Sequence, residues 1–410
     1  MQTIWTDLRF DGERFSTEPA ALTLDRGVIT RIEPLADRAA PAPGGVHDAR
    51  GALTLPGLVN AHVHIARGGV FEPNERISLA QTRRNLEGCL AAGVTTIGDM
   101  ACAPALVREL KRYLAKDPRR GPAIRAAGPI VTAPRGYPLD WLPPLFARLG
   151  LALPCATERD AQAAAARVAE AGMDHVKLAV MHESYARKPI PAVKEAVARA
   201  LVREAHALGL RVLAHAHTVA DYRVALAAGV DALMHSSFEP LDEDLVARVA
   251  AAGVPVCPTL WVFESACLGV EMRLDADARY TRHVEPYIRA SWRRFAEAFA
   301  ASGDVLPDGM AGGLEKSVAA EAIRNASANL LLLRDAGVPI VFGNDASYGF
   351  SLVARPVDEL GAMQRAGMPP EACLRAATSA AAALLRCDDR GTLAVGKRAD
   401  VVVADARARD

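Results

Sequence analysis

One pattern recurs along the chain and restricts its fold more than any other feature: an alanine-rich stretch, a single glycine, and then a short apolar run without polar alternation. The glycines of the six copies are Gly93, Gly172, Gly209, Gly229, Gly253 and Gly337. Glycine ends helices because it readily adopts the left-handed conformation, and unbroken apolar runs are typical of parallel strands buried on both faces. The repeat therefore predicts alternating helices and parallel strands.

Two other segments raise the expected number of parallel strands to eight. They are residues 58–64, LVNAHVH, and a weaker candidate at 123–131. Eight strand–helix units close into a (β/α)8 TIM barrel, so we expect an α/β fold of this type. With 410 residues, 51% of them hydrophobic, the chain is long enough for a barrel and a smaller domain. An open, doubly wound sheet is the competing architecture.

The two ends of the chain differ in character from the middle. Residues 1–56 alternate short β-like pieces with turns, and the tail GTLAVGKRADVVVAD predicts another strand pair. Neither end could bury a core alone, so we expect residues 1–56 and 388–410 to combine into a small composite β-sandwich domain beside a barrel of residues 57–387. The connection 261–315 is unusually long, which predicts either a lid over the site or a plain surface insertion.

Charge and cysteine content restrict the partners and the location. Lys and Arg number 48, as do Asp and Glu, so no net positive field exists to hold nucleic acid or an anionic membrane. The seven cysteines are scattered and form no CxxC pair, which favours a reducing, cytoplasmic setting. We recognise no secretory signal pattern and no apolar run of membrane-spanning length. We expect a small-molecule substrate and leave homo-oligomerisation open.

Two histidines, His62 and His64, stand two positions apart on the predicted strand 58–64. Alternate side chains of a strand share a face, so both imidazoles should point the same way. Polar residues also follow later strands, at the end of a barrel where active sites lie. The other residues expected to converge there are Lys177, His215, His235 and Asp345. Four imidazoles and a carboxylate exceed what one catalytic ion usually takes from a protein, so this set predicts two divalent ions.

Lys177 is unusual in such a set, because a free ammonium cannot coordinate a cation and would repel it. A carbamate formed with carbon dioxide would turn its side chain into a carboxylate able to bridge two ions. The plainer alternative is a lysine paired with a nearby acid or reaching for solvent.

These motifs resemble those of the amidohydrolase superfamily, and within it the imidazolonepropionase-like branch that includes prolidase-type (Xaa-Pro dipeptidase-like) enzymes. The resemblance covers nearly the whole chain and includes LPGLVNAHVH, AAGVTT, VKL, LAHAHT, MHSSFE, GNDAS and GTLAVGKRADVVVAD. Its most specific part is the ordered set of HxH, Lys, His, His and Asp on successive strands. It implies a barrel with a composite β domain, a carbamate on Lys177, and two metal ions, with zinc favoured, bridged by hydroxide.

The resemblance also implies a role for each converging residue. His62, His64 and Asp345 would hold the more buried ion, and His215 and His235 the more exposed one, with the Lys177 carbamate between them. Asp345 would in addition act as the catalytic proton shuttle, taking the proton of the attacking hydroxide and delivering it to the leaving nitrogen. Its plainer alternative is to cap the next helix.

Candidate substrate contacts lie in the loops that follow the strands. They are Tyr137, His182, His217 and Trp261, with further aromatic residues at Tyr185, Phe238, Phe263 and Tyr348. These rings predict a partly apolar pocket, although ordinary loop packing would explain them equally well. A carboxylate clamp could come from Arg67, Arg135, Arg187 or Arg355, and the sequence does not choose among them.

The expected activity is metal-dependent hydrolysis of an amide bond in a small, hydrophobic N-acyl amino acid, dipeptide or related carbonyl compound. The loops PRGYP and AVMHES depart from the prolidase-type pattern, so the metal chemistry transfers better than the dipeptide specificity. The alternatives are a mononuclear deaminase or cyclic amidohydrolase, phosphotriesterase or lactonase activity at the same site, and a catalytically silent binding scaffold. Thr218 stands where deaminases of the superfamily generally place a glutamate.

Overall fold

Two parallel sheets form the centre of the molecule. The computed structural model describes residues 1–35, 44–66, 78–140, 142, 145–148, 150–185, 187–281, 284–302, 316–346 and 349–405. The first sheet has the order β10-β9-β8 and consists of β8 (Leu58–Val63), β9 (Val94–Asp99) and β10 (Ala123–Ala126). The second has the order β12-β11-β13-β14-β15-β16 and consists of β11 (Ile130–Thr132), β12 (Ala152–Pro154), β13 (His175–Ala179), β14 (Arg211–His215), β15 (Ala232–Met234) and β16 (Val256–Cys257). The expected α/β class with parallel strands is confirmed.

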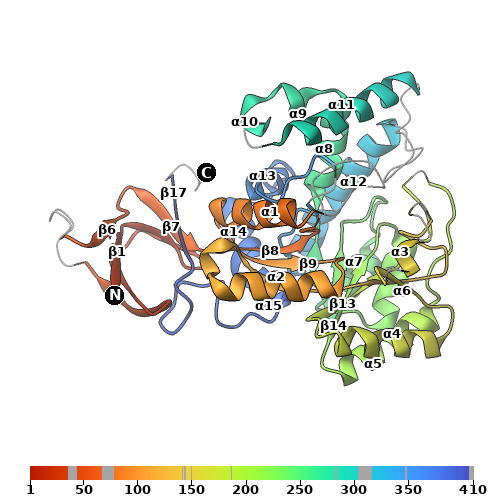
Figure 1. The fold of residues 1–410 in the computed structure, drawn as a ribbon, viewed down its shortest axis with the longest axis horizontal. Coiled ribbons are helices and arrows are strands. Elements are labelled where there is room, and N and C mark those ends of the chain that lie inside the picture. The colour runs from red at the N-terminus through yellow and green to blue at the C-terminus, as the bar shows by residue number, and fades with distance from the viewer. Residues whose placement is uncertain are drawn as a thin grey trace.

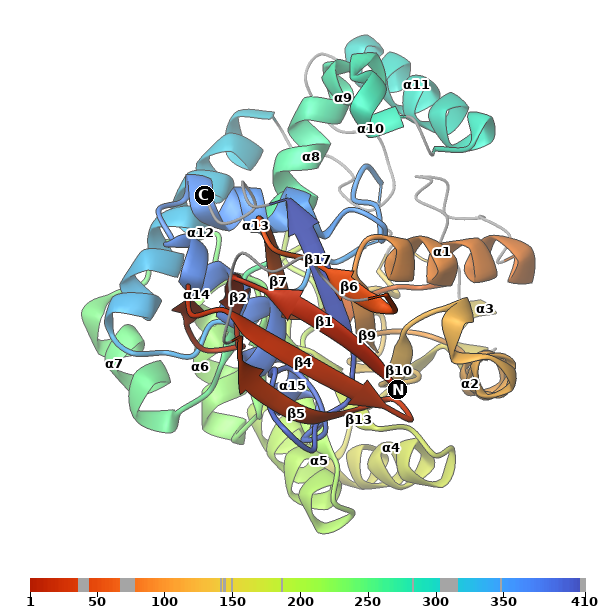
Figure 2. The ribbon, with the colours of Figure 1, turned by 90° about the vertical axis from the view of Figure 1, so that its left-hand side faces the viewer.

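Helices connect these strands and lie around them (Figures 1 and 2). They include α1 (Leu79–Ala91), α2 (Pro104–Lys116), α4 (Glu158–Glu170), α5 (Glu195–Ala207), α6 (Val219–Ala228), α7 (Glu243–Ala252) and α12 (Lys316–Asp335). Each of the six glycines singled out above follows one of these helices within two residues, with φ between +62° and +82°. The predicted helix ends are therefore confirmed. Thr157 and Thr218 begin α4 and α6 with capping boxes that Asp160 and Asp221 complete.

The strands depart from the expected eight-stranded barrel at three places. The segment expected as the eighth strand, residues 339–346 after Gly337, has only isolated parallel bridges, at Ile340 and Ala346. It is called the eighth segment below. The strand expected at 123–131 is divided into β10 and β11, which lie in different sheets on either side of Gly128 (φ +71°). Strand β12 was not predicted. Among the described residues, the assigned strands thus form two parallel sheets rather than one closed ring.

Local side-chain chemistry explains why the eighth segment lacks a regular ladder. Asn344 Oδ1 accepts a hydrogen bond from the backbone N–H of Ala346, and Asn60 Oδ1 accepts from the backbone N–H of Asn344. Asparagine side chains that bond to nearby backbone compete in this way with strand pairing. Asp345 lies between these contacts in the left-handed region, at φ +48°. The backbone at this point turns the Asp345 side chain toward the interior and does not extend the sheet.

The hydrophobic core lies mainly between the helices and the outer faces of the sheets, in one large cluster. A second cluster joins strand residues with α15 (Ala381–Leu384) and the residues that follow it. The helix α14 (Pro370–Arg375) and the π-helical turn Ala376–Ala380 precede α15 and contribute to the large cluster instead. The members of the second cluster are Val59, Ala61, Met100, Leu213, Ala232, Met234, Cys257, Val341, Ala381, Ala382, Leu384, Leu385 and Cys387. Residues of both parallel sheets therefore pack against one another in a common interior.

Two further sheets are built from the ends of the chain and lie beside the helical part (Figure 1). One has the order β5-β4-β1-β6, from β1 (Gln2–Thr6), β4 (Ala20–Asp25), β5 (Val28–Pro34) and β6 (Val46–Asp48). The other has the order β17-β7-β2-β3, from β2 (Leu8–Phe10), β3 (Phe15–Ser16), β7 (Ala52–Pro56) and β17 (Val401–Asp405). The strand pair expected in the tail is a single strand, with one bridge between Val28 and Arg398 before it. That these two sheets form a separate domain stays a prediction.

The long connection after β16 is mostly helical. It contains α8 (Leu260–Val270), α9 (Arg273–Ala276), α10 (Ala278–Thr281) and α11 (Pro286–Ala301), and residues 303–315 of the expected lid lie outside the described residues. The remaining elements are α3 (Leu145–Arg148), α13 (Pro356–Arg365) and the 3-10 turn Pro118–Arg120. In Figure 1, α9, α10 and α11 stand at the top of the molecule. That this segment covers the site stays a prediction.

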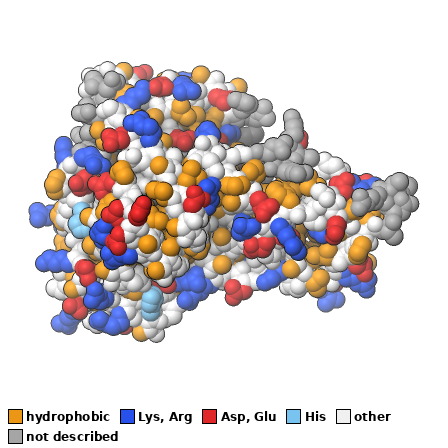
Figure 3. Space-filling model, turned by 180° about the vertical axis from the view of Figure 1, so that it is seen from behind, with side chains coloured by type: hydrophobic (Ala, Val, Ile, Leu, Met, Phe, Trp, Pro, Cys, Tyr) orange, Lys and Arg blue, Asp and Glu red, His pale blue; other side chains and the backbone are white. Residues whose placement is uncertain are grey.

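The surface shows both signs of charge. On the face drawn in Figure 3, Lys and Arg side chains alternate with Asp and Glu side chains and with apolar ones. Within the described part of the chain, no helix combines the length and the apolar character that crossing a membrane requires.

Gly343 is the point at which the eighth segment approaches β8 most closely. A Cβ atom added there would lie 2.6 Å from Cys257 Sγ, 2.6 Å from His62 Cβ and 2.9 Å from the His62 backbone nitrogen. We expect Gly343→Ala to lower the free energy of unfolding by about 1–3 kcal/mol, the usual range for overpacking a core. Chemical denaturation measures this, with Gly44→Ala as the control because a Cβ there meets open space. Equal stability of the two variants would contradict this packing.

Candidate metal centre

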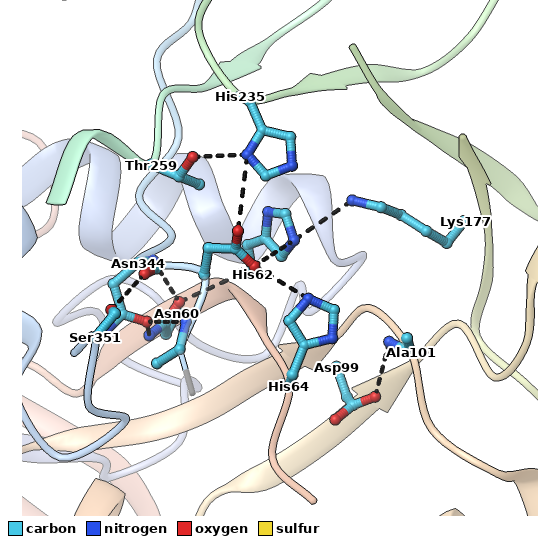
Figure 4. Close-up of polar contacts among 12 residues, drawn as sticks. Asn60, His62, His64, Asp99, Ala101, Lys177, His235, Thr259, Asn344 and Ser351 are labelled. Carbon is cyan, nitrogen blue, oxygen red and sulfur yellow. Dashed lines mark hydrogen bonds and ion pairs between the residues drawn. The ribbon is translucent and has the colours of Figure 1, made fainter. Parts of the chain in front are cut away.

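A first group of ligand atoms gathers at the end of β8. His62 lies in β8, His64 directly follows it, and Asp345 lies in the neighbouring eighth segment. His62 Nε2 and His64 Nε2 approach Asp345 Oδ1 to 3.2 and 3.0 Å (Figure 4). The ligand atoms of the three residues all lie within 4.8 Å of one another, and all three residues are buried. The alternation along the strand thus brings both imidazoles to one carboxylate, as expected.

Two buried asparagines hold this group in place, and the sequence analysis did not identify them. Asn60 Nδ2 donates to Asn344 Oδ1 at 2.8 Å, and Asn60 Oδ1 accepts from the His62 backbone N–H at 3.3 Å. The Asp345 backbone N–H donates to the His62 carbonyl at 2.9 Å. Their positions in the sequence could have indicated them. Asn60 stands two residues before His62 in NAHVH, and Asn344 stands directly before Asp345 in GNDAS.

A second group lies at the ends of β14 and β15. His215 ends β14, His217 follows two residues later, and His235 follows β15. Their ring centroids lie 4.4 to 4.5 Å apart in all three pairs. Their ligand atoms also lie within 4.8 Å of one another, and all three are buried. Sequence analysis placed His217 among substrate contacts, whereas the structure places it inside this histidine group.

Thr259 orients His235. The Thr259 hydroxyl lies 2.7 Å from His235 Nδ1, which leaves Nε2 to face the group. Both residues adopt left-handed backbone conformations, with φ of +87° at His235 and +49° at Thr259. Such conformations are costly for residues other than glycine and concentrate at functional sites. Asp345 also has such a conformation. It does not cap a helix, because the next helix among the described residues, α13, begins only at Pro356.

Lys177 projects from β13 toward the first group. Its Nζ lies 3.4 Å from His62 Nε2, and the residue is 2% exposed (Figure 4). Burial lowers the pKa of its ammonium to about 8. Of the two plainer alternatives, a lysine reaching for solvent is thereby excluded, whereas pairing with a nearby acid is not, since the charge of Asp345 acts to raise the Lys177 pKa.

Four of these histidines are suited to bind cations because their imidazoles are neutral. Burial, with added repulsion from neighbouring cationic groups, lowers the pKa of His62, His215, His217 and His235 well below the ordinary value of 6.5. Only a neutral imidazole has a lone pair to donate to a metal ion. Ring nitrogens of three of these histidines also have no hydrogen-bond partner among the described residues: His62 Nδ1, His215 Nε2 and His217 Nδ1. Unpartnered buried polar atoms are costly, so this donor set fits divalent cations.

Asp221, which completes the capping box of α6, connects the loop after β13 to the turn after β14. Its Oδ1 accepts from the His182 backbone N–H at 3.0 Å and contacts His182 Nδ1 at 2.6 Å. Its Oδ2 accepts from the backbone N–H groups of His217 and Thr218, both at 3.0 Å. One buried carboxylate therefore fixes both loops beside the second histidine group.

Aromatic rings border the second group. Tyr137 stacks on His215 with centroids 4.3 Å apart, and Phe238 stacks on His217 at 4.4 Å. Phe263 meets Phe238 edge to face at 4.6 Å. Trp261 lies elsewhere: it is 6% exposed, and its ring lies near Tyr280, at 6.2 Å. The substrate roles of Tyr137 and Trp261 stay predictions, and Tyr348 lies outside the described residues.

The other candidate polar residues are engaged in different ways. Asp99 is fully buried and accepts from the backbone N–H groups of Ile65 and Ala101 at 2.9 and 3.2 Å. Arg187 lies 3.4 Å from Glu183 and 3.7 Å from Glu239, and Arg355 pairs with Asp358 at 2.7 Å. Arg135 is exposed, and Arg67 lies outside the described residues. His175 is a buried residue of β13.

The comparison with known proteins decides the family. Residues 53–409 match the amidohydrolase family. The chain belongs to the amidohydrolase family. An uncharacterized protein of Mycobacterium tuberculosis (strain ATCC 25618 / H37Rv) is 29% identical over 333 residues, which cover 80% of this amidohydrolase and 73% of the relative. The family membership predicted from the sequence is confirmed.

Solved structures share the fold of this amidohydrolase over almost its whole length. A Xaa-Pro dipeptidase with methionine bound in its active site is similar with a TM-score of 0.75 and 21% identity, covering 98% of this chain and 93% of the dipeptidase. The ochratoxinase of A. niger is similar with a TM-score of 0.73 and 20% identity, covering 98% of this chain and 89% of the other. The similar structures thus include the prolidase-type branch that the sequence resembles.

The pairing of His182 with Asp221 makes part of the stability pH-dependent. The carboxylate of Asp221 raises the pKa of His182 above its ordinary value of 6.5. A group with a raised folded-state pKa stabilises the fold below its unfolded pKa, and this stabilisation is lost as pH rises through the folded pKa. The destabilisation caused by His182→Gln, measured by urea unfolding, should therefore be larger at about pH 5.5 than at about pH 8.5. A loss of stability that does not vary with pH would contradict the pairing.

Proposed function

We propose that this amidohydrolase cleaves the C–N bond of a small, hydrophobic N-acyl amino acid, dipeptide or related amide at a centre of two divalent cations. The observation that carries the proposal is the position of Asp345, which belongs to the first three-donor group and also lies next to the second. Its Oδ1 faces His62 and His64 at 3.2 and 3.0 Å, and its Oδ2 lies 3.9 Å from His235 Nδ1. One carboxylate therefore adjoins both groups.

The residues that would hold the cations follow from this geometry. His62, His64 and Asp345 would hold one, and His215 and His235 would hold the other. Imidazole and carboxylate suit zinc, which we favour. When bound, two such ions lower the pKa of water toward neutrality and polarise a carbonyl.

Asp345 would move the proton. Its Oδ2 is the oxygen that points away from His62 and His64 and toward the second group, and it would take a proton from the attacking water. The same oxygen would then return the proton to the leaving nitrogen, which must be protonated to depart as an amine. Asn344 and the backbone bond from Asp345 to the His62 carbonyl keep this carboxylate in position.

Lys177 would carry the carbamate. Its uncharged amine would attack carbon dioxide, forming an N–C bond and releasing one proton, to give a carboxylate at the end of the side chain. The lowered pKa supports this step, because more of the amine is uncharged at neutral pH. The Nζ position beside His62 Nε2 supports a product within reach of the ligand groups.

The rings beside the second group support a substrate with an apolar or aromatic part. Tyr137, Phe238 and Phe263 would provide a face for such a group next to the histidines. Among structures with this fold are a Xaa-Pro dipeptidase and an ochratoxinase, which agrees with amide substrates of this kind.

The finer architecture is part of the proposal. We infer that the two parallel sheets and residues 339–346 together form a barrel. Support comes from hydrogen bonds on both sides of that segment: Val341 N–H to the Val256 carbonyl at 2.9 Å, and Ala61 N–H to the Phe342 carbonyl at 3.0 Å. On the other side, Asp174 N–H donates to the Ala126 carbonyl at 2.8 Å, which connects β10 to β13. The composite β domain and the cytoplasmic location remain proposals, the latter in keeping with seven free thiols.

The first test of this function is a hydrolysis screen with the zinc- or manganese-loaded enzyme. The panel contains N-acyl amino acids, dipeptides, cyclic amides, esters and phosphotriesters. We expect amide hydrolysis that a chelator abolishes, and a decrease in kcat of about 10²- to 10⁴-fold in Asp345→Asn, the usual contribution of a general acid–base group. Asp244→Asn, which changes an exposed carboxylate, is the control. Full activity of Asp345→Asn, or activity on phosphotriesters alone, would overturn the proposal.

The second test addresses the carbamate. We expect Lys177→Ala to lose activity and to regain part of it when acetate or propionate is added, because a free carboxylate can occupy the space of the missing one. Lys116→Ala, which removes an exposed lysine, should behave like the unaltered enzyme. Full activity of Lys177→Ala without added acid would exclude the carbamate role.

A further inference from the structure

We propose that His217 is a third imidazole ligand of the cation beside His215 and His235, and that it binds through Nδ1 while Tyr185 holds its other ring nitrogen. The inference deepens the proposed function, on which it rests for the presence of a cation at this position. It changes the second site from a pair of histidines to a complete three-histidine set. The sequence pattern agrees, because HAH at 215–217 repeats the spacing of HVH at 62–64.

The two ring nitrogens of His217 have different surroundings. Nε2 lies 3.0 Å from the Tyr185 hydroxyl. Nδ1 is buried and has no hydrogen-bond partner among the described residues, and the whole residue is 1% exposed. A neutral imidazole has one N–H and one lone pair. With Nε2 as the donor to Tyr185, the lone pair on Nδ1 is left inside the protein without a partner.

The ring cannot easily turn to find another partner. Phe238 stacks on it at 4.4 Å with an interplanar angle of 19°, and Phe263 meets it edge to face at 5.6 Å. Its backbone N–H is held by Asp221 at 3.0 Å. Stacking and backbone bonding thus fix the direction of Nδ1 before any ligand binds.

A cation is the partner that fits that direction. The ligand atoms of His217, His215 and His235 lie within 4.8 Å of one another. Three imidazoles with one open position are a common ligand set of catalytic zinc. Metal-binding histidines almost always donate their other ring N–H to a fixed group, which orients the ring. His217 has such a group in Tyr185, and His235 has one in Thr259 at 2.7 Å.

Metal binding tests the inference without relying on activity. The full chain is stripped with a chelator and titrated with zinc against a chromophoric competitor, and metal content is measured after dialysis. We expect the unaltered enzyme to bind two ions. His217→Phe, which keeps an aromatic ring for Phe238 to stack on, should weaken one site by more than about 100-fold, beyond the effect of losing an outer contact. Tyr185→Phe should weaken the same site by about 10- to 100-fold.

His47→Phe is the matched control, because it makes the same change at an exposed histidine. Two ions bound to His217→Phe as tightly as to the unaltered enzyme would overturn the inference. A raised KM with unchanged zinc affinity would overturn it as well, because His217 would then contact substrate. If His217→Phe does not fold, Tyr185→Phe decides alone, and unchanged affinity in that variant would reject the assignment.

The outcomes also separate this inference from the proposed function. An enzyme that hydrolyses amides while His217→Phe keeps both ions refutes only the ligand role of His217. An enzyme that loses one ion in His217→Phe but cleaves no amide in the panel refutes only the proposed function.

Discussion

The contact between β8 and the segment 339–346 is the interaction on which the candidate site depends. It joins residues almost 300 positions apart, through the Asn60–Asn344 side-chain pair and the backbone bond from Asp345 to the His62 carbonyl. Because Gly343 has no side chain, the two backbones can approach until His62 and Asp345 share a group of ligand atoms. Burial then lowers the pKa of His62, so that the same packing leaves its imidazole neutral, with a lone pair to donate.

Much of this arrangement could be predicted from the sequence, because its signals are local or periodic. Glycines such as Gly229 and Gly253 mark helix ends through a backbone conformation that few other residues adopt. The spacing of His62 and His64 follows from the alternation of a strand, and the position of polar residues after apolar runs follows from the parallel arrangement. These rules need no knowledge of distant contacts.

What the sequence did not predict depends on such distant contacts. The eighth segment is as apolar at its start as a strand. However, the Asn344 side chain accepts from the Ala346 backbone N–H and the Asn344 backbone N–H donates to Asn60, and a regular ladder does not form. The sequence predicted His217 only as a substrate contact. In the structure its backbone N–H donates to Asp221, and its ring lies against His215 and His235. The position of Trp261 also depends on distant contacts: two backbone bonds to the buried Glu359 carboxylate fix the start of α8, and the Trp261 ring lies near Tyr280. Its substrate role stays a prediction.

The Asp221 carboxylate has a consequence for how enzymes of this kind can diversify. Loops at the open end of such a fold usually change independently, since each is attached to its own strand. Here a single side chain on α6 bonds to the loop after β13 through His182 and to the turn that bears His217. Altering the first loop to admit a new substrate would therefore disturb the histidines as well, unless His182 were transplanted together with it. If the proposed function holds, this carboxylate would link substrate selectivity to ion affinity, and recombination that keeps α6 and the loop after β13 together should yield functional chimaeras more often than recombination that separates them.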